Sequence, residues 1–176
     1  MKLNGYTLKA VKTMETTDGV AYTGNIYFDG KKIGMAYNDG RGGMTDVSLV
    51  PGIAGRAAHD AALTEDCVER LFTLHDYEDM FRANTRGRPE KGMAFVTYSD
   101  PLGIDAFLCG KDATLDEISA QVNKQKPGWE IGSIEIFRSL DDFMIDESRQ
   151  QEQADGGQDF TGDPGEESGG MTMKMQ

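Results

Sequence analysis

Three Asp-Gly pairs constrain the N-terminal part of this chain more than any other feature. They begin at Asp18, Asp29 and Asp39, ten or eleven residues apart. Asp-Gly favours tight hairpins because both central positions of a type I′ turn need positive φ. Apolar and polar residues alternate between the pairs, as half-buried antiparallel strands require. The first fifty residues are therefore predicted to form a β-meander, whose apolar positions are Tyr6, Leu8 and Ala10, then Val20, Tyr22, Ile26 and Phe28, then Ile33, Met35 and Tyr37, and last Val47 to Val50.

A long helix is predicted to follow the meander. Thr64 is a suitable N-cap, and the acidic Glu65 and Asp66 in the first turn suit the helix dipole. Apolar residues recur at steps of three and four, which predicts one buried stripe. A separate short helix is expected between residues 54 and 63, and Gly87 ends the long one. The predicted stripe consists of Cys67, Leu71, Leu74, Tyr77 and Phe81.

The remaining half carries strand, helix and strand signals in turn. Met93–Tyr98 is apolar on both faces, so it is expected inside a sheet, paired with Ile104–Cys109. Thr114 and Glu117 form a capping box that starts a helix over Leu115–Lys124. The last strand, Trp129–Phe137, changes its apolar phase, which predicts a bulge near Gly132. A short helical turn is expected over residues 140–145.

Charge divides the chain into a domain and a tail. From Asp141 onward there are ten acidic and two basic residues, so this segment carries eight of the twelve net negative charges. Such a segment cannot bury enough apolar surface to offset its loss of entropy on folding. We therefore expect one α+β domain over residues 1–145, an antiparallel sheet with two main helices packed on it, followed by a disordered acidic tail over 146–176.

Composition also limits the partners. A net charge of −12 disfavours unaided binding to nucleic acid or to anionic lipid. No apolar run is long enough for a signal peptide or a membrane span, so a cytoplasmic location is expected. The two cysteines, Cys67 and Cys109, are expected to be reduced and buried rather than joined.

The sequence offers no positioned catalytic group. His59 and His75 each lie eight residues from Cys67, about 12 Å along a straight helix, which is beyond hydrogen-bond reach. The four cysteines and histidines lack zinc-site spacing, and no calcium loop is present. The loop Asp39–Gly43 is either a phosphate cradle or a hairpin with a glycine bulge, and the missing nucleotide motifs favour the hairpin. We therefore predict no enzyme activity, metal or cofactor.

Acidic residues form the first candidate binding surface. Glu65, Glu69, Asp76 and Asp79 fall within about an 80° arc of the long helix, opposite the apolar stripe. Phe72 falls in the same arc, where an aromatic side chain among polar groups resembles an interface anchor. The alternatives are that the row is only a solvated helix face and that Phe72 packs under a loop.

Basic residues form the second candidate surface. Arg82, Arg86, Arg88 and Lys91 cluster within ten residues at the end of the same helix. They either satisfy the dipole of the helix C-terminus or contact phosphate. An acidic face with a basic end suits docking onto a protein–nucleic-acid complex, which displays both signs of charge.

The strand and turn motifs resemble a known class of proteins. The motifs are Tyr6–Lys12, Asp18–Tyr22 and Tyr27–Gly43. They resemble small accessory proteins of phages and mobile elements, among them anti-CRISPR inhibitors of the RNA-guided DNA nuclease of type II systems. The resemblance implies a bacterial host cell and a non-catalytic inhibitor. Its partner would be the guide-loaded nuclease, and it would block either DNA binding or cleavage.

A second function remains open from the residues alone. Tyr22, Tyr27 and Tyr37 interleave with Lys31, Lys32 and Arg41, and the C-terminal segment is acidic. This combination is typical of single-strand DNA-binding accessory proteins, whose acidic tails recruit partners. The net negative domain argues against it. A homodimer through a sheet edge is also left open.

Overall fold

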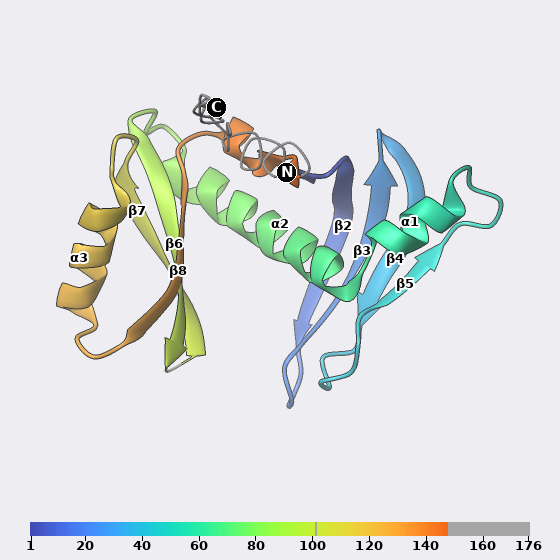
Figure 1. Cartoon of the computed structure of the whole chain (residues 1–176), viewed down its shortest axis with the longest axis horizontal. Coiled ribbons are helices and arrows are strands. Elements are labelled where there is room, and N and C mark those ends of the chain that lie inside the picture. Colours follow the sequence, from blue (N-terminus) through green and yellow to red (C-terminus); the bar gives the residue numbers. More distant parts are fainter. Residues whose placement is uncertain (101, 148–176) are drawn as a thin grey trace, which may run out of the picture. The chain divides into compact units, whose positions relative to one another are not determined.

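The protein is an α+β protein, and nine strands form two sheets in the part of the chain that the structure describes. The computed structural model describes residues 1–100 and 102–147, and the compact unit spans Met1–Asp146. Among these residues the larger sheet has the order β5-β4-β3-β2-β1-β9 and the smaller one the order β7-β6-β8. The residues of the predicted tail that follow Glu147 lie outside the described residues. Figure 1 shows both sheets and the long helix α2 that runs from one to the other.

The larger sheet is the predicted meander with an unpredicted extension. Its antiparallel strands are β2 (Tyr6–Glu15), β3 (Val20–Phe28), β4 (Lys31–Asn38) and β5 (Asp46–Leu49). The short strand β1 (Lys2–Leu3) pairs antiparallel with β2 and parallel with β9 (Met144–Ile145). Segments from the two ends of the unit thus lie side by side, a pairing that local sequence signals cannot reveal.

Only one Asp-Gly pair forms the predicted type of turn. Asp29 and Gly30 both have positive φ, 45° and 79°, as the two-residue connection between β3 and β4 requires. At the other two pairs Asp18 and Asp39 keep negative φ, and longer loops join the strands. The pairs nevertheless lie between successive strands, as predicted. Met35 and Tyr37 do not share the buried face of Ile33, because Ile33 is an extra residue between the Tyr27–Lys32 and Ile26–Gly34 partners.

The helices begin and end close to the predicted residues. Helix α1 spans Arg56–Ala62 and helix α2 spans Glu65–Thr85. Thr64 caps α2, its hydroxyl accepting a hydrogen bond from the backbone N–H of Cys67 at 3.3 Å. Helix α3 (Leu115–Gln125) starts with the predicted capping box of Thr114 and Glu117.

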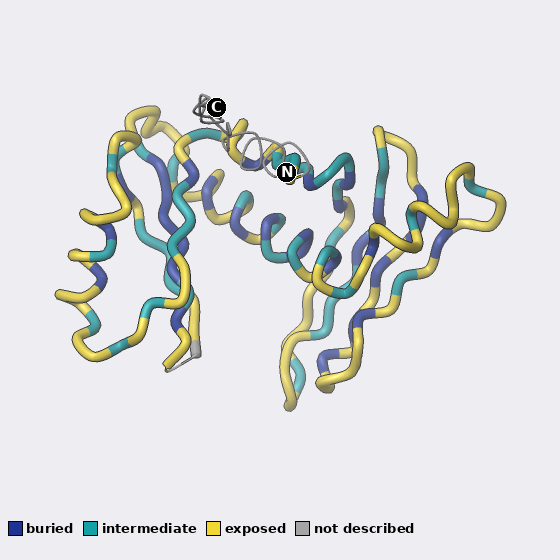
Figure 2. The backbone as a smooth tube through the Cα atoms, viewed as in Figure 1, coloured by how far each residue is buried: buried dark blue, intermediate teal, exposed yellow. Residues whose placement is uncertain are grey.

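The smaller sheet has β6 (Lys91–Asp100) between β7 (Leu102–Gly110) and β8 (Glu130–Phe137). In β8 the partners change from Thr97–Ser133 to Tyr98–Ile131, so Gly132 is the extra residue of the predicted bulge. A 3₁₀ turn, η1 (Leu140–Phe143), follows. The buried positions of β6 are continuous, as Figure 2 shows, because helices cover both faces of this sheet.

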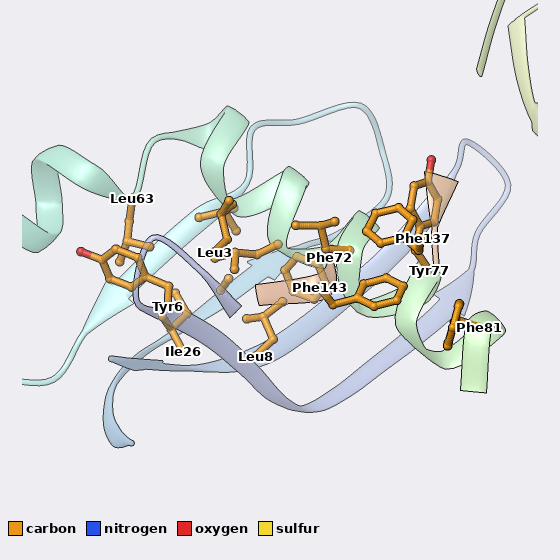
Figure 3. Close-up of a cluster of buried hydrophobic side chains, with 14 of the residues drawn as sticks. Leu3, Tyr6, Leu8, Ile26, Leu63, Phe72, Tyr77, Phe81, Phe137 and Phe143 are labelled. Carbon is orange, nitrogen blue, oxygen red and sulfur yellow. The ribbon is translucent and has the colours of Figure 1, made fainter. Parts of the chain in front are cut away.

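One core joins both sheets through α2. Phe72 packs against Tyr22 of β3 with ring centroids 4.1 Å apart, and Tyr77 stacks on Phe95 of β6 at 3.8 Å. Figure 3 shows residues of this core, including Leu8 of the larger sheet and Phe137 of the smaller. A helix packed on both sides buries more than one stripe, so the single stripe predicted from the sequence is too narrow.

Helix α3 is fixed to the other face of the smaller sheet by a cation held between aromatic rings. Lys126 forms an ion pair with Asp105, and its Nζ lies 3.9 Å from the Trp129 ring centroid. The Tyr98 hydroxyl donates a hydrogen bond to Asp105 at 3.0 Å. The hydrogen bond from Lys126 is the largest cause that lowers the pKa of Asp105, burial opposes it, and the Tyr98 hydroxyl adds to the lowering.

Because the folded pKa of Asp105 lies below its unfolded value, its ionisation stabilises the fold above about pH 4. That contribution is lost as the pH falls through the folded pKa. We predict that the free energy of unfolding falls less between pH 6 and pH 2.5 in Asp105→Asn than in the wild type, as measured by urea unfolding. The other carboxylates are common to both proteins, so equal pH dependence would contradict the role of this pair.

Candidate interaction surfaces

Three of the four predicted acidic residues form an exposed row on α2. Glu69 is exposed, and the side chains of Asp76 and Asp79 are 61% and 67% exposed. The row from Glu69 to Asp79 is about 15 Å long at 1.5 Å per residue. Because α2 is packed on both sheets, the spacing of these carboxylates is fixed by the fold. We call Glu69, Asp76 and Asp79 the acidic row.

Glu65 has a different role from the rest of the predicted row. It is half-buried, and its Oε1 accepts a hydrogen bond from the backbone N–H of Thr45 at 3.0 Å. The Thr45 hydroxyl in turn lies 2.7 Å from the Tyr22 hydroxyl. Glu65 therefore ties the loop after β4 to the first turn of α2, and one of its oxygens is already used within the fold.

The prediction that Phe72 is an exposed anchor is wrong. Phe72 is only 6% exposed and belongs to the core, and Val68, beside it, is fully buried. Its ring also reaches Gly24 of β3, where an added Cβ would lie 3.2 Å from it. The helical arc places Phe72 among carboxylates, but at this position the ring packs on Tyr22 and Gly24 of β3 while the neighbouring Glu69 stays exposed.

His75 lies beside the acidic row, a contact that the sequence analysis missed. Its Nδ1 is 3.6 Å from a carboxylate oxygen of Asp76 and 3.7 Å from one of Asp79, and it makes no hydrogen bond. The spacing of four residues between His75 and Asp79 was the available signal. When protonated, His75 would reduce the negative charge at this end of the row.

Two of the predicted arginines, Arg82 and Arg86, line a hollow at the C-terminal end of α2. The hollow has a volume of about 680 Å³, with Phe81 and Leu140 among its lining residues. Arg82 also forms an ion pair with Glu78, whose second oxygen binds the amino group of Met1. Burial opposes ionisation of Glu78, but these hydrogen bonds outweigh it and lower the pKa of the carboxyl.

A second hollow, of about 250 Å³, adjoins the first through Phe81, Thr85 and Leu140. It adds basic residues from distant parts of the chain, which the sequence did not place here. Arg138 follows β8, and its guanidinium donates to the carbonyls of Lys111 and Ala113 at 2.8 and 3.1 Å. The basic end of α2 is hereafter the set Arg82, Arg86, Arg88, Lys91, Lys111 and Arg138.

The glycine-rich loop is built as a structural loop. The side-chain amide of Asn38 donates to the Gly43 carbonyl and to the Thr45 hydroxyl, both at 3.1 Å, and its oxygen accepts from the Gly40 N–H at 2.8 Å. The adjoining hollow, about 390 Å³, is lined by three carboxylate residues, which oppose a phosphate. These carboxylate residues are Asp18, Glu65 and Glu69. Their charge favours the interpretation of Asp39–Gly43 as a hairpin loop over a phosphate cradle.

His59 and Cys67 are half-buried, and of the two cysteines only Cys109 is buried in a core. His59 Nδ1 lies 2.9 Å from the Tyr6 hydroxyl, and its ring packs edge-on against Phe28. Burial first, and then the charge of nearby Cys67, raise the pKa of Tyr6. Cys109 is buried in the core beneath α3, and burial raises the pKa of its thiol. Cys67 and Cys109 are not joined in a disulfide, and the described residues contain no group of three or more side chains suited to a metal ion.

Comparisons with known proteins add no relatives. No family model matches the chain, and neither curated proteins nor solved structures gave a match. None of the helices in the described ranges combines the length and hydrophobicity needed to cross a bilayer. The fold defines this chain as an α+β protein. Its acidic row and the basic end of α2 are two separate surfaces of opposite charge.

Replacing Phe72 by alanine tests where this ring lies. A buried phenylalanine leaves a cavity when truncated, so Phe72→Ala should lower the free energy of unfolding by about 3–5 kcal/mol. Met80→Ala on the same helix, where the side chain is 42% exposed, should change it by no more than about 0.5 kcal/mol. Urea unfolding followed by circular dichroism measures both. If Phe72→Ala left the free energy of unfolding unchanged, this result would contradict the burial of the ring.

Proposed function

We propose that the protein is a non-catalytic inhibitor that binds a bacterial nucleic-acid-handling protein, with the guide-loaded nuclease of type II CRISPR systems as its partner. The observation that carries the proposal is the acidic row. Three carboxylates stand on a helix held by both sheets, so they keep their spacing without a partner. A basic groove that normally holds a phosphate backbone can accept such a row.

The pre-ordered row supports tight and selective binding in two ways. Its side chains project from a helix that needs no ordering on binding, which reduces the entropy lost in the complex. Its charge steers the approach to a positive channel, which raises the association rate and makes it depend on salt. RNA-guided nucleases hold their guide and target in positively charged channels, so they offer the complementary surface.

The basic end of α2 supports a partner that contains nucleic acid. It lies about 25 Å from Glu69 along the helix axis, counted to Arg86. An inhibitor with both surfaces would contact protein through the acidic row and phosphate through the arginines. Catalysis by this chain is not required for such inhibition, because occupying the channel excludes DNA.

The test is a DNA cleavage assay with guide-loaded nuclease across a range of inhibitor concentrations. We expect the wild-type protein to stop cleavage near equimolar ratio. The variant Glu69→Gln/Asp76→Asn/Asp79→Asn should need roughly tenfold more protein for half inhibition, with a weaker dependence on salt. Unfolding of each variant by urea confirms that the fold is kept.

A matched variant separates the row from net charge. Asp100→Asn/Asp116→Asn/Glu130→Gln removes three exposed carboxylates from the region of the smaller sheet and α3, so it changes the net charge equally. It should inhibit like the wild type. Full cleavage at a large molar excess of wild-type protein would contradict binding to the nuclease. Equal inhibition by both triple variants would show that the acidic row is not the contact.

A further inference from the structure

The outer face of the larger sheet carries lysines, tyrosines and methionine instead of an apolar core. The register of the strands shows which residues lie on this face. Lys9 of β2 pairs with Asn25 of β3, which pairs with Met35 of β4, and these three residues form one row across the sheet. The rows two residues away along β3 in either direction lie on the same face. The opposite face carries the buried Leu8, Ile26 and Ala36. The outer-face residues of the three rows are Thr7, Tyr27 and Lys32, then Lys9, Asn25 and Met35, then Lys12, Thr23 and Tyr37.

Five of these residues are exposed, and Thr7, Thr23, Asn25 and Tyr27 are half-buried. Tyr37 is 48% and Met35 44% exposed, and Lys9, Lys12 and Lys32 are all exposed. In β4 exposed positions alternate with buried ones from Gly34 to Asn38, as the tube in Figure 2 shows. The face therefore offers aromatic rings and ammonium groups to a ligand at the same time.

The ammonium groups are not neutralised by neighbouring carboxylates. Within the described part of the chain, no salt bridge involves Lys9, Lys12 or Lys32. Lys9 instead lies 4.5 Å from the ring centroid of Tyr27. Asp46, opposite Tyr37 on β5, is the carboxylate paired across this face. The face is thus locally positive although the chain carries a net charge of −12.

We propose that this outer face binds single-stranded nucleic acid, with the three lysines on phosphates and a base stacked on the exposed ring of Tyr37. Stacking needs bases that are free of a duplex, since an exposed ring on a flat sheet cannot reach bases paired inside a helix. Aromatic rings between lysines on a sheet are suited to that ligand, and stacking tolerates any base. The separation of charge removes the objection that a net negative domain cannot bind a polyanion.

Tyr22 does not belong to this face, although the sequence grouped it with Tyr27 and Tyr37. Its ring packs on Phe72 and its hydroxyl contacts Thr45, so it lies on the inner face. The proposal is independent of inhibition, because it concerns the free protein and another surface. Purified protein without any nuclease can therefore test it.

The experiment is fluorescence anisotropy with a labelled 20-nucleotide oligo-dT and the full chain at low salt. We expect micromolar binding, and a slope of log K against log salt of about −2 for three neutralised phosphates. Tyr37→Ala should weaken binding roughly tenfold through the lost stacking, whereas Tyr37→Phe should keep it. An unlabelled duplex of the same length should compete poorly.

Charge-matched variants locate the surface. Lys9→Gln/Lys12→Gln should weaken binding and reduce the magnitude of the salt slope by about 1.4. Arg56→Gln/Lys124→Gln removes the same charge from α1 and α3 and should bind like the wild type. Absence of binding at low salt, equal losses in both double variants, or equal affinity for duplex would each overturn the proposal. Failure here leaves the inhibition assay unaffected, and the reverse also holds.

Discussion

Helix α2 holds the fold together by packing on two sheets at once. Phe72 packs on Tyr22 on one side of the helix, and Tyr77 stacks on Phe95 on the other. Arg70 donates from both terminal nitrogens of its guanidinium, Nη1 and Nη2, to the carboxylate of Glu135 in β8. These contacts fix both sheets to one rigid element. Only a narrow strip of the helix stays exposed, and that strip carries the acidic row. The same packing that stabilises the protein therefore decides which charges other molecules meet.

Local signals predicted the elements well because they depend on neighbouring residues. Thr64 caps α2, Thr114 and Glu117 cap α3, and the change of phase near Gly132 marks the bulge. The failures have a different origin. Phe72 was misplaced because a helical arc assumes one packing partner, and α2 has two. The parallel pairing of β1 with β9 and the contact of Arg138 with the turn after β7 depend on tertiary structure, which spacing in the sequence does not encode.

Net charge is a poor guide to what this protein binds. The acidic row lies on α2, the basic end is built from three separate segments of the chain, and the lysines of β2 and β4 lie on the outer face of the larger sheet. Charges farther apart than the Debye length of about 8–10 Å are largely screened from one another. A partner therefore responds to the charge of the surface that it contacts and not to the net charge of the chain. A partner that combines basic protein with nucleic acid meets complementary charge on more than one of these surfaces.

The most direct measurement is carboxyl footprinting of the protein, free and bound to guide-loaded nuclease, with labelling by carbodiimide and read-out by mass spectrometry. If the acidic row is the contact, labelling of Glu69, Asp76 and Asp79 falls in the complex, while Asp116 and Glu130 are labelled equally in both states. Unchanged labelling of the three row carboxylates in a complex that forms would contradict this central claim.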